Sequence, residues 1–193
     1  GVFDRLIVLL NSSQPIQMDF LDDAAIDVDS CLWIGNTGMS GVNAVAEALV
    51  GTVVPSGRLS DTYVKDNFSS PAMASWGMNE NKVFSNQWQE AGLDETQKYY
   101  GVYQEGIYVG YRYYETRYAD VVENRNNVGV YDYDSVVYAP FGYGLSYTEF
   151  SYSDFAVSEN TDGKTYDVSV TVKNTGDTYS GKEVVQIYLQ KPY

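Results

Sequence analysis

The chain has 193 residues, of which 44% are hydrophobic, so it is long enough to bury a core as one domain or two small ones. Its formal net charge of −14, from 12 basic and 26 acidic residues, disfavours nucleic acid and anionic membrane surfaces as partners. No apolar run approaches the roughly 20 residues that a membrane-spanning helix requires. Histidine is absent and Cys31 is the only cysteine, which excludes Ser-His-Asp and Cys-His catalysis within the chain. We expect no metal and no cofactor.

The first third of the chain reads as a β/α unit. Two short continuous apolar runs, residues 6–10 and 30–34, predict strands covered on both faces. The segment 16–29 between them predicts a short helix or a turn. A helix is predicted over residues 42–50, with Ser40 as its N-cap and Gly51 as its stop. Its apolar residues follow i, i+3, i+4, i+7, i+8 spacing: Val42, Val45, Ala46, Leu49 and Val50.

Three glycines, Gly35, Gly38 and Gly41, separate the second strand from this helix. Their spacing is GxxGxxG, whereas dinucleotide folds have GxGxxG. We therefore favour a loop that needs positive φ, or close backbone approach, over a phosphate site. A nucleotide-binding α/β protein is the weakest of the alternatives.

Residues 55–58, Pro-Ser-Gly-Arg, predict a turn after the helix. We expect Arg58 to brace loops through backbone carbonyls or a carboxylate, because arginine offers several donors. Residues 66–92 are polar and irregular, which is typical of a functional or interfacial loop. Trp76 and Trp88 in this loop are the candidates for contact with a sugar or another domain, and loop anchoring is the other interpretation.

Residues 103–114, Tyr-Gln-Glu-Gly-Ile-Tyr-Val-Gly-Tyr-Arg-Tyr-Tyr, are interpreted as strand-like, with alternate residues on opposite faces. Glu105 and Arg112 carry the chemistry here. We favour a structural ion pair over a general acid, because pairing with a cation lowers the pKa of a carboxyl group, the wrong direction for an acid catalyst.

After Thr148 the pattern becomes purely β. Residues 150–157 predict one strand and residues 166–172 a second, with alternating apolar and polar positions. A turn at 174–177 precedes a third predicted strand at 183–189.

Three motifs together resemble glycoside hydrolase family 3, the β-glucosidase and β-xylosidase family. They are residues 55–62 (PSGRLSDT), residues 103–114 and residues 140–148 (PFGYGLSYT). The resemblance implies an α/β fold: residues 1–147 form the C-terminal part of an α/β sandwich domain, and residues 148–193 the first strands of a fibronectin type III-like domain. Such a sandwich needs about seven strands, so we expect the second domain to be truncated.

The resemblance also implies retaining glycoside hydrolysis, with an Asp nucleophile and a second carboxyl group as acid/base. Neither group matches a position in this chain, so we expect both to lie outside it and the chain alone to be inactive. The implied partners are a catalytic (β/α)8 barrel domain of the same enzyme and a β-linked oligosaccharide or glycoside. Arg58, Glu105 and Arg112 are expected to be structural.

Two questions stay open at the level of sequence. A non-catalytic carbohydrate-binding or adhesion module is the main alternative, and sugar binding by this chain alone would favour it. The compartment, cytoplasmic or secreted, is unknown because the chain carries no signal peptide yet resembles a fragment.

Overall fold

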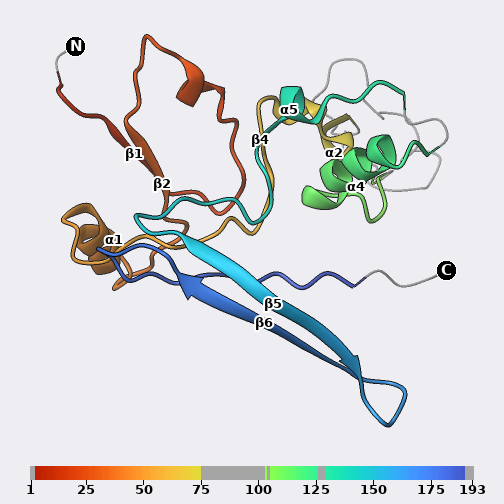
Figure 1. Cartoon of the computed structure of the whole chain (residues 1–193). Coiled ribbons are helices and arrows are strands. Elements are labelled where there is room, and N and C mark those ends of the chain that lie inside the picture. Colours follow the sequence, from red (N-terminus) through yellow and green to blue (C-terminus); the bar gives the residue numbers. More distant parts are fainter. Residues whose placement is uncertain (1–2, 75–102, 104, 126–128, 190–193) are drawn as a thin grey trace, which may run out of the picture. The chain divides into compact units, whose positions relative to one another are not determined.

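The computed structural model describes residues 3–74, 103, 105–125 and 129–189 (Figure 1). The chain divides into two units, which we describe separately. The first consists of Gly1–Asn36 with Leu59–Phe141, and the second of Thr37–Arg58 with Gly142–Tyr193. Helices occur together with three two-stranded sheets in the described residues, which confirms the predicted α/β class. The domain boundary after residue 147 stays a prediction.

The first unit begins with a parallel pair of strands. Strand β1 (Ile7–Leu10) pairs with β2 (Ser30–Trp33), as the two apolar runs predict. A short 3-10 helix, Asp19–Asp22, occupies the connection, where a short helix or turn was expected. The expectation that both faces are covered is wrong within the described residues: Leu10 is buried, but Ile7 is 48% exposed. Only one face of this two-stranded sheet packs on the core.

The core of the first unit is built around a second, antiparallel pair, β3 (Tyr63–Val64) with β4 (Val137–Ala139). Neighbouring residues of a strand point to opposite faces, so Tyr63 and Val64 enter different clusters. Tyr63 packs with Leu10, Met18 and Ala139. Val64 packs with Tyr114 and Val137. The short strand β3 therefore contributes one buried side chain to each cluster.

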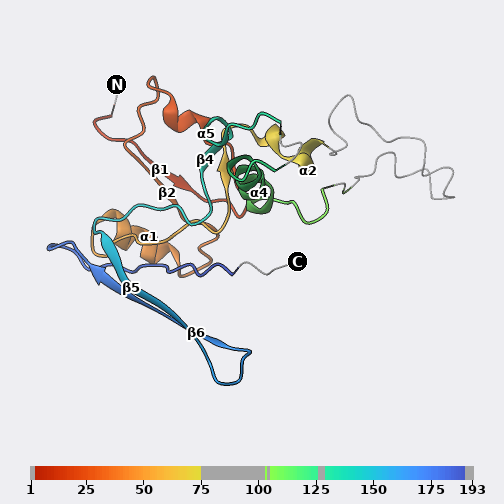
Figure 2. The ribbon, with the colours of Figure 1, turned by 45° about the vertical axis from the view of Figure 1, so that its right-hand side comes forward.

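Among the described residues of the first unit, three helices accompany β3 and β4: α2 (Pro71–Ala74), α4 (Tyr111–Val122) and α5 (Tyr133–Val136). Both views place α2, α4 and α5 close together (Figure 2). Helix α4 contradicts the strand-like interpretation of residues 103–114. Gly110 adopts φ +58 and interrupts any extended run, and a helix then places Tyr114 in the core.

The second unit contains helix α1 (Val42–Leu49), close to the predicted limits. The predicted cap is wrong, because Gly41 occupies the N-cap position and no side chain caps the helix. The predicted stop is confirmed: Gly51 follows the helix with φ +77. Gly35 and Gly38 in the preceding loop also have positive φ, as the loop interpretation requires.

A long two-stranded ribbon makes up the rest of the second unit. Strand β5 (Phe150–Glu159) pairs antiparallel with β6 (Tyr166–Asn174), and Figures 1 and 2 show the ribbon from two sides. The register shifts between Ser153 and Ala156. Residues 183–189 form no strand, contrary to the prediction, because no neighbouring described segment pairs with their backbone.

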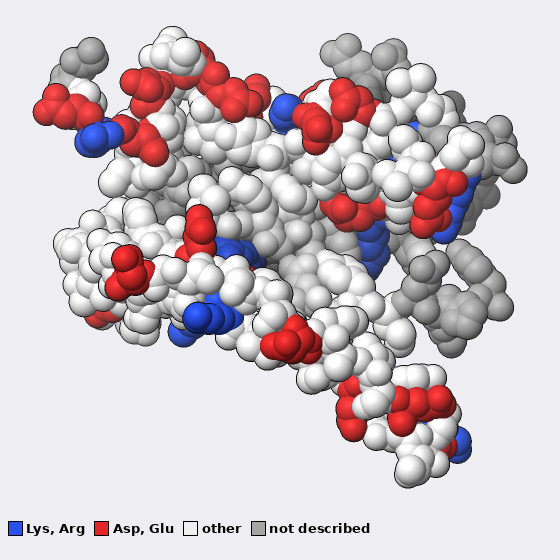
Figure 3. All heavy atoms as spheres, viewed as in Figure 1, with Lys and Arg blue, Asp and Glu red and all other residues white. Residues whose placement is uncertain are grey.

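Acidic side chains outnumber basic ones over the face seen in Figure 3, in keeping with the net charge of −14. No helix in the described part of the chain has the length and apolar character needed to cross a bilayer.

Candidate functional site

Arg58 joins the first and third motifs within the second unit. Its Nη1 donates to the carbonyl oxygen of Gly144 at 2.6 Å, and its Nη2 donates to Glu183 Oε2 at 2.9 Å. The hydroxyl oxygens of Ser56 and Ser146 lie 3.3 Å apart beside this contact. The side chains of Arg58 and Glu183 are 18% and 12% exposed. Their ion pair is therefore less screened by solvent than a surface pair.

Two glycines of the third motif permit this arrangement. A Cβ at Gly144 would lie 2.3 Å from the carbonyl oxygen of Gly57, so a side chain cannot be accommodated without a backbone shift. Gly142 has φ +83, and a Cβ there would lie 2.2 Å from the Gln186 side-chain nitrogen. The Phe-Gly-Tyr-Gly spacing therefore reflects two separate backbone requirements of one loop.

Glu183 is the carboxylate partner of Arg58, and the sequence did not predict it. Burial opposes its ionisation, but hydrogen bonds from Tyr152 and Arg58 outweigh burial and hold the pKa of its carboxyl group below the ordinary value of 4.5. The group is therefore ionised at neutral pH. Its partner is 125 residues away in sequence, and a single Glu in an apolar segment gives no local signal of such a contact.

In the first unit, the end of the first motif contacts the start of α4. Gly110 is the N-cap of this helix, and a Cβ there would lie 2.8 Å from Asp61 Oδ1. The same oxygen accepts a hydrogen bond from the backbone N–H of Thr62 at 2.8 Å. The Asp61 carboxylate thus lies at the positive end of α4, where negative charge is favourable. The first motif therefore contacts the second motif here, as it contacts the third through Arg58.

Glu105 and Arg112 form no ion pair with each other in the described residues, contrary to the interpretation from sequence. The guanidinium of Arg112 lies over the ring of Tyr111, 5.5 Å from its centroid. Glu105 Oε2 is buried and has no hydrogen-bond partner within the described part of the chain. The pairing fails because α4 begins at Tyr111 and leaves Arg112 exposed.

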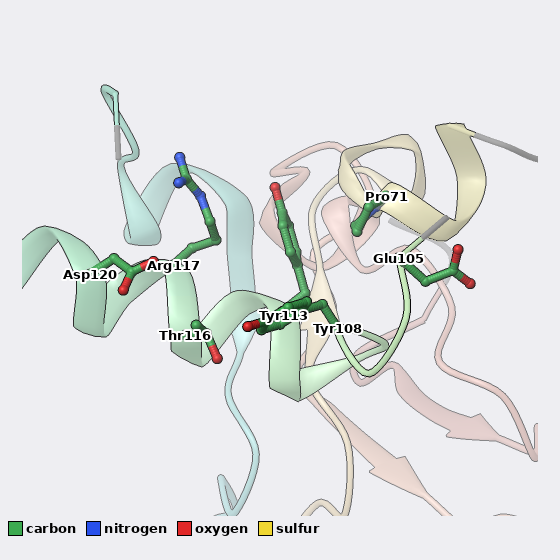
Figure 4. Close-up of a pocket in the computed structure, with 7 residues that line it drawn as sticks. All are labelled: Pro71, Glu105, Tyr108, Tyr113, Thr116, Arg117 and Asp120. Atoms are coloured by element: carbon green, nitrogen blue, oxygen red, sulfur yellow. The ribbon is translucent and has the colours of Figure 1, made fainter. Parts of the chain in front are cut away.

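A cavity of about 320 Å³ lies beside α4 (Figure 4). It is lined by Pro71 of α2, by Glu105 and Tyr108 before α4, and by one face of α4 with i, i+3, i+4, i+7 spacing: Tyr113, Thr116, Arg117 and Asp120. In Figure 4, Glu105 and Asp120 lie at opposite ends, with both tyrosine rings between them. The cavity therefore combines aromatic rings with charged and hydroxyl groups.

Two half-buried tyrosines, Tyr131 and Tyr133, contact the same helix. The hydroxyl of Tyr133 donates to Glu115 Oε1 at 2.5 Å, and the guanidinium of Arg117 lies 5.3 Å from the ring centroid of Tyr131. Burial raises the pKa of both phenols well above its ordinary value. Both tyrosines therefore stay protonated at neutral pH. The hydroxyl of Tyr133 donates to Glu115, whereas the hydroxyl of Tyr131 has no hydrogen-bond partner in the described residues.

Trp76 and Trp88, the sugar-contact candidates, lie outside the described residues. Within the described residues, no three His, Cys, Asp or Glu side chains are grouped so that they could hold a metal ion. The described site residues thus comprise a brace centred on Arg58, a helix start at Gly110 and the cavity beside α4.

In the described residues, helices beside small sheets form an α/β fold, in which the first motif contacts the second near Asp61 and the third through Arg58. A sequence profile of the Glycosyl hydrolase family 3 C-terminal domain matches residues 2–111, and the chain belongs to this family.

Characterised relatives agree with this assignment. The chain is 35% identical over 190 residues to a beta-glucosidase of Ruminococcus albus, covering 98% of this chain and 16% of that protein. It is 37% identical over 184 residues to a beta-glucosidase of Kluyveromyces marxianus, covering 94% of this chain and 17% of the relative. The chain therefore spans about a sixth of the length of these relatives.

Solved structures show the same fold. A beta-glucosidase from Paenibacillus barengoltzii matches with a TM-score of 0.65 and 32% identity, covering 93% of this chain and 16% of that structure. Beta-glucosidase 3B from Thermotoga neapolitana, in complex with glucose, matches with a TM-score of 0.59 and 34% identity, covering 89% of this chain and 19% of that one.

Proposed function

We propose that this chain is the non-barrel portion of a retaining β-glycosidase of the β-glucosidase type, where it helps to shape the active site and braces the barrel domain. The observation that carries the proposal is the alignment of 98% of the chain with a beta-glucosidase at 35% identity. The substrate is a β-linked oligosaccharide or glycoside, and the partner is a catalytic (β/α)8 barrel of the same enzyme.

In this account the two catalytic carboxyl groups belong to parts of the enzyme outside this chain. A retaining enzyme needs them about 5–5.5 Å apart in one pocket. Arg58 has a structural role, which its contacts with Gly144 and Glu183 support. We assign structural roles to Glu105 and Arg112 too, and the turn before α4, in which the Tyr108 N–H donates to the Glu105 carbonyl at 3.0 Å, supports one for Glu105. Trp76 and Trp88 stay candidates for sugar contact.

We assign residues 1–147 to the α/β sandwich domain and residues 148–193 to the first strands of a fibronectin type III-like domain. The antiparallel pairing of β5 with β6 supports the second assignment, since such sandwiches are built from antiparallel strands. Strand β5 begins at Phe150, just after the proposed boundary.

The substitution Glu105→Gln in the complete enzyme tests whether Glu105 has a structural role or is the general acid. If Glu105 is structural, the variant loses thermal stability and keeps its turnover within roughly tenfold of wild type, whereas loss of a general acid costs about 10²–10⁴ in rate. A glycoside with an activated leaving group is the control, because it needs little protonation. A thousandfold loss on the ordinary glycoside, spared on the activated one and without a change in Tm, would identify Glu105 as the acid.

A further inference from the structure

The segment just before helix α4 exposes three consecutive large apolar residues of the first unit. Ile107 is 71% exposed, and Tyr108 and Val109 are each 45% exposed. Single exposed apolar residues are ordinary on a protein surface, whereas a continuous exposed run is unfavourable in water and indicates a functional surface. We call residues 106–110, Gly-Ile-Tyr-Val-Gly, the apolar loop.

The backbone of the apolar loop is held in one shape. The loop begins and ends with glycines whose φ values are +59 and +58, a conformation that favours glycine. The N–H of Tyr108 donates to the carbonyl oxygen of Glu105 at 3.0 Å. The N–H of Val109 donates to the carbonyl oxygen of Ile107, also at 3.0 Å. A surface that is already ordered loses little conformational entropy on binding, which favours association.

Both ends of the apolar loop are anchored in the first unit, but its side chains face outward. At Gly110 the backbone passes so close to Asp61 that a Cβ would lie 2.8 Å from Asp61 Oδ1. Just before the loop, Glu105 Oε2 is buried, and Figure 4 shows the chain running from Glu105 into α4. A Cβ at Gly106, in contrast, would meet no atom within 4 Å. The loop therefore projects from a fixed base.

The chemistry of the apolar loop selects an apolar protein surface as its partner. Residues 106–111 carry no charged side chain, although 20% of the chain is charged. A second copy of the chain is disfavoured, because two molecules with a net charge of −14 repel each other. The two beta-glucosidases aligned above supply another candidate, since this chain covers only 16% of one and 17% of the other. Most of each relative therefore lies outside the aligned part.

We infer that the apolar loop docks into an apolar pocket on the barrel domain of the same enzyme, with Ile107 as its anchor. Ile107 enters the pocket because it is the most exposed of the three apolar side chains, and Tyr108 and Val109 pack against the rim. The inference rests on the proposed function, which supplies the barrel domain as the partner.

Photo-cross-linking in the complete protein tests the inference. In the variant Ile107→p-benzoylphenylalanine, irradiation joins the side chain to its neighbour, and mass spectrometry of the digest identifies the joined peptide. We expect a peptide of the barrel domain. Ile26→p-benzoylphenylalanine is the matched control, because Ile26 is an exposed isoleucine of the first unit in a turn with Asp23 and Asp27. Its charged neighbours oppose burial in an apolar pocket, so we expect no cross-link to the barrel there.

A stability measurement separates docking from a role in folding. Ile107→Ser should leave the Tm of the 193-residue chain unchanged, because the side chain is 71% exposed in it. The same substitution should lower the Tm of the complete protein, in which the pocket loses its anchor. Ile26→Ser should change neither Tm.

The inference fails if position 107 cross-links only to residues 1–193, to a second copy of the chain, or to nothing. It also fails if Ile107→Ser lowers both Tm values equally or leaves the complete protein unaffected. Turnover of a β-glucoside by a complete protein in which position 107 does not reach the barrel removes the inference alone. A cross-link to the barrel in a protein that hydrolyses no β-glycoside removes the proposed activity alone.

Discussion

At the scale of single residues, Arg58 is the side chain that connects two distant segments of the second unit. It contacts a backbone carbonyl of one motif and a carboxylate of a distant segment at the same time. A planar guanidinium makes this possible, because its two terminal nitrogens donate in different directions from one rigid group. A lysine in its place would reach only one of these partners.

We therefore expect Arg58→Lys to lower the free energy of unfolding by about 1–3 kcal/mol, since one partly buried acceptor loses its donor. Urea denaturation of the chain measures the change. Arg5→Lys is the control, because the side chain of Arg5 is 80% exposed in its ion pair with Asp29 and such pairs contribute about 0–1 kcal/mol. Equal effects of the two substitutions would contradict the role of Arg58 as a brace.

The partner of Arg58 predicts a dependence of stability on pH. The pKa of Glu183 is lower in the folded chain than its ordinary value of 4.5, so folding is stabilised while the group is ionised. This contribution is fully present above the unfolded pKa and disappears as the pH falls through the folded pKa. The stability difference between wild type and Glu183→Gln should therefore be largest near about pH 6–7 and shrink below about pH 4.5. A difference that does not change between these pH values would exclude the lowered pKa.

At the scale of elements, the apolar pattern predicted β1, β2, α1, β5 and β6, because each of these segments has a clear period or a continuous apolar run. Helix α4 was missed. Its many aromatic residues favour a strand, and the sequence does not show that Gly110 has a positive φ that ends the extended segment. The predicted third strand at 183–189 was wrong for a different reason, since a strand exists only where a neighbour supplies hydrogen bonds.

Gly110→Ala tests how α4 begins. The residue has φ +58, and a Cβ there would lie 2.8 Å from Asp61 Oδ1, so the substitution combines backbone strain with a clash. We expect a loss of about 2–4 kcal/mol in unfolding free energy, from strain of about 1–3 kcal/mol plus the displaced carboxylate. Gly106→Ala is the control: its φ is +59 but its surroundings are open, so it should cost less. A smaller loss at Gly110 than at Gly106 would show that Asp61 does not pack against the helix start.

At the scale of the whole molecule, the sequence predicted those parts of the candidate site whose residues lie close together in one motif. The motifs indicated the family and the bracing contacts of Arg58, because glycine, proline and arginine spacings are local signals. Glu183 and the cavity beside α4 were not predictable, since both depend on residues brought together by folding. The chain spans about a sixth of its relatives, so catalysis is a property that we assign to the complete enzyme.

Hydrolysis of nitrophenyl β-glucoside, compared between the 193-residue chain and the complete protein, tests the central claim most directly. We predict turnover by the complete protein and none above background by the chain alone, because we propose that both catalytic carboxyl groups lie outside it. Turnover by the purified chain alone, at a rate near that of the complete protein, would contradict the claim that the barrel domain is required. Absence of turnover on any β-glycoside by the complete protein would contradict the proposed function.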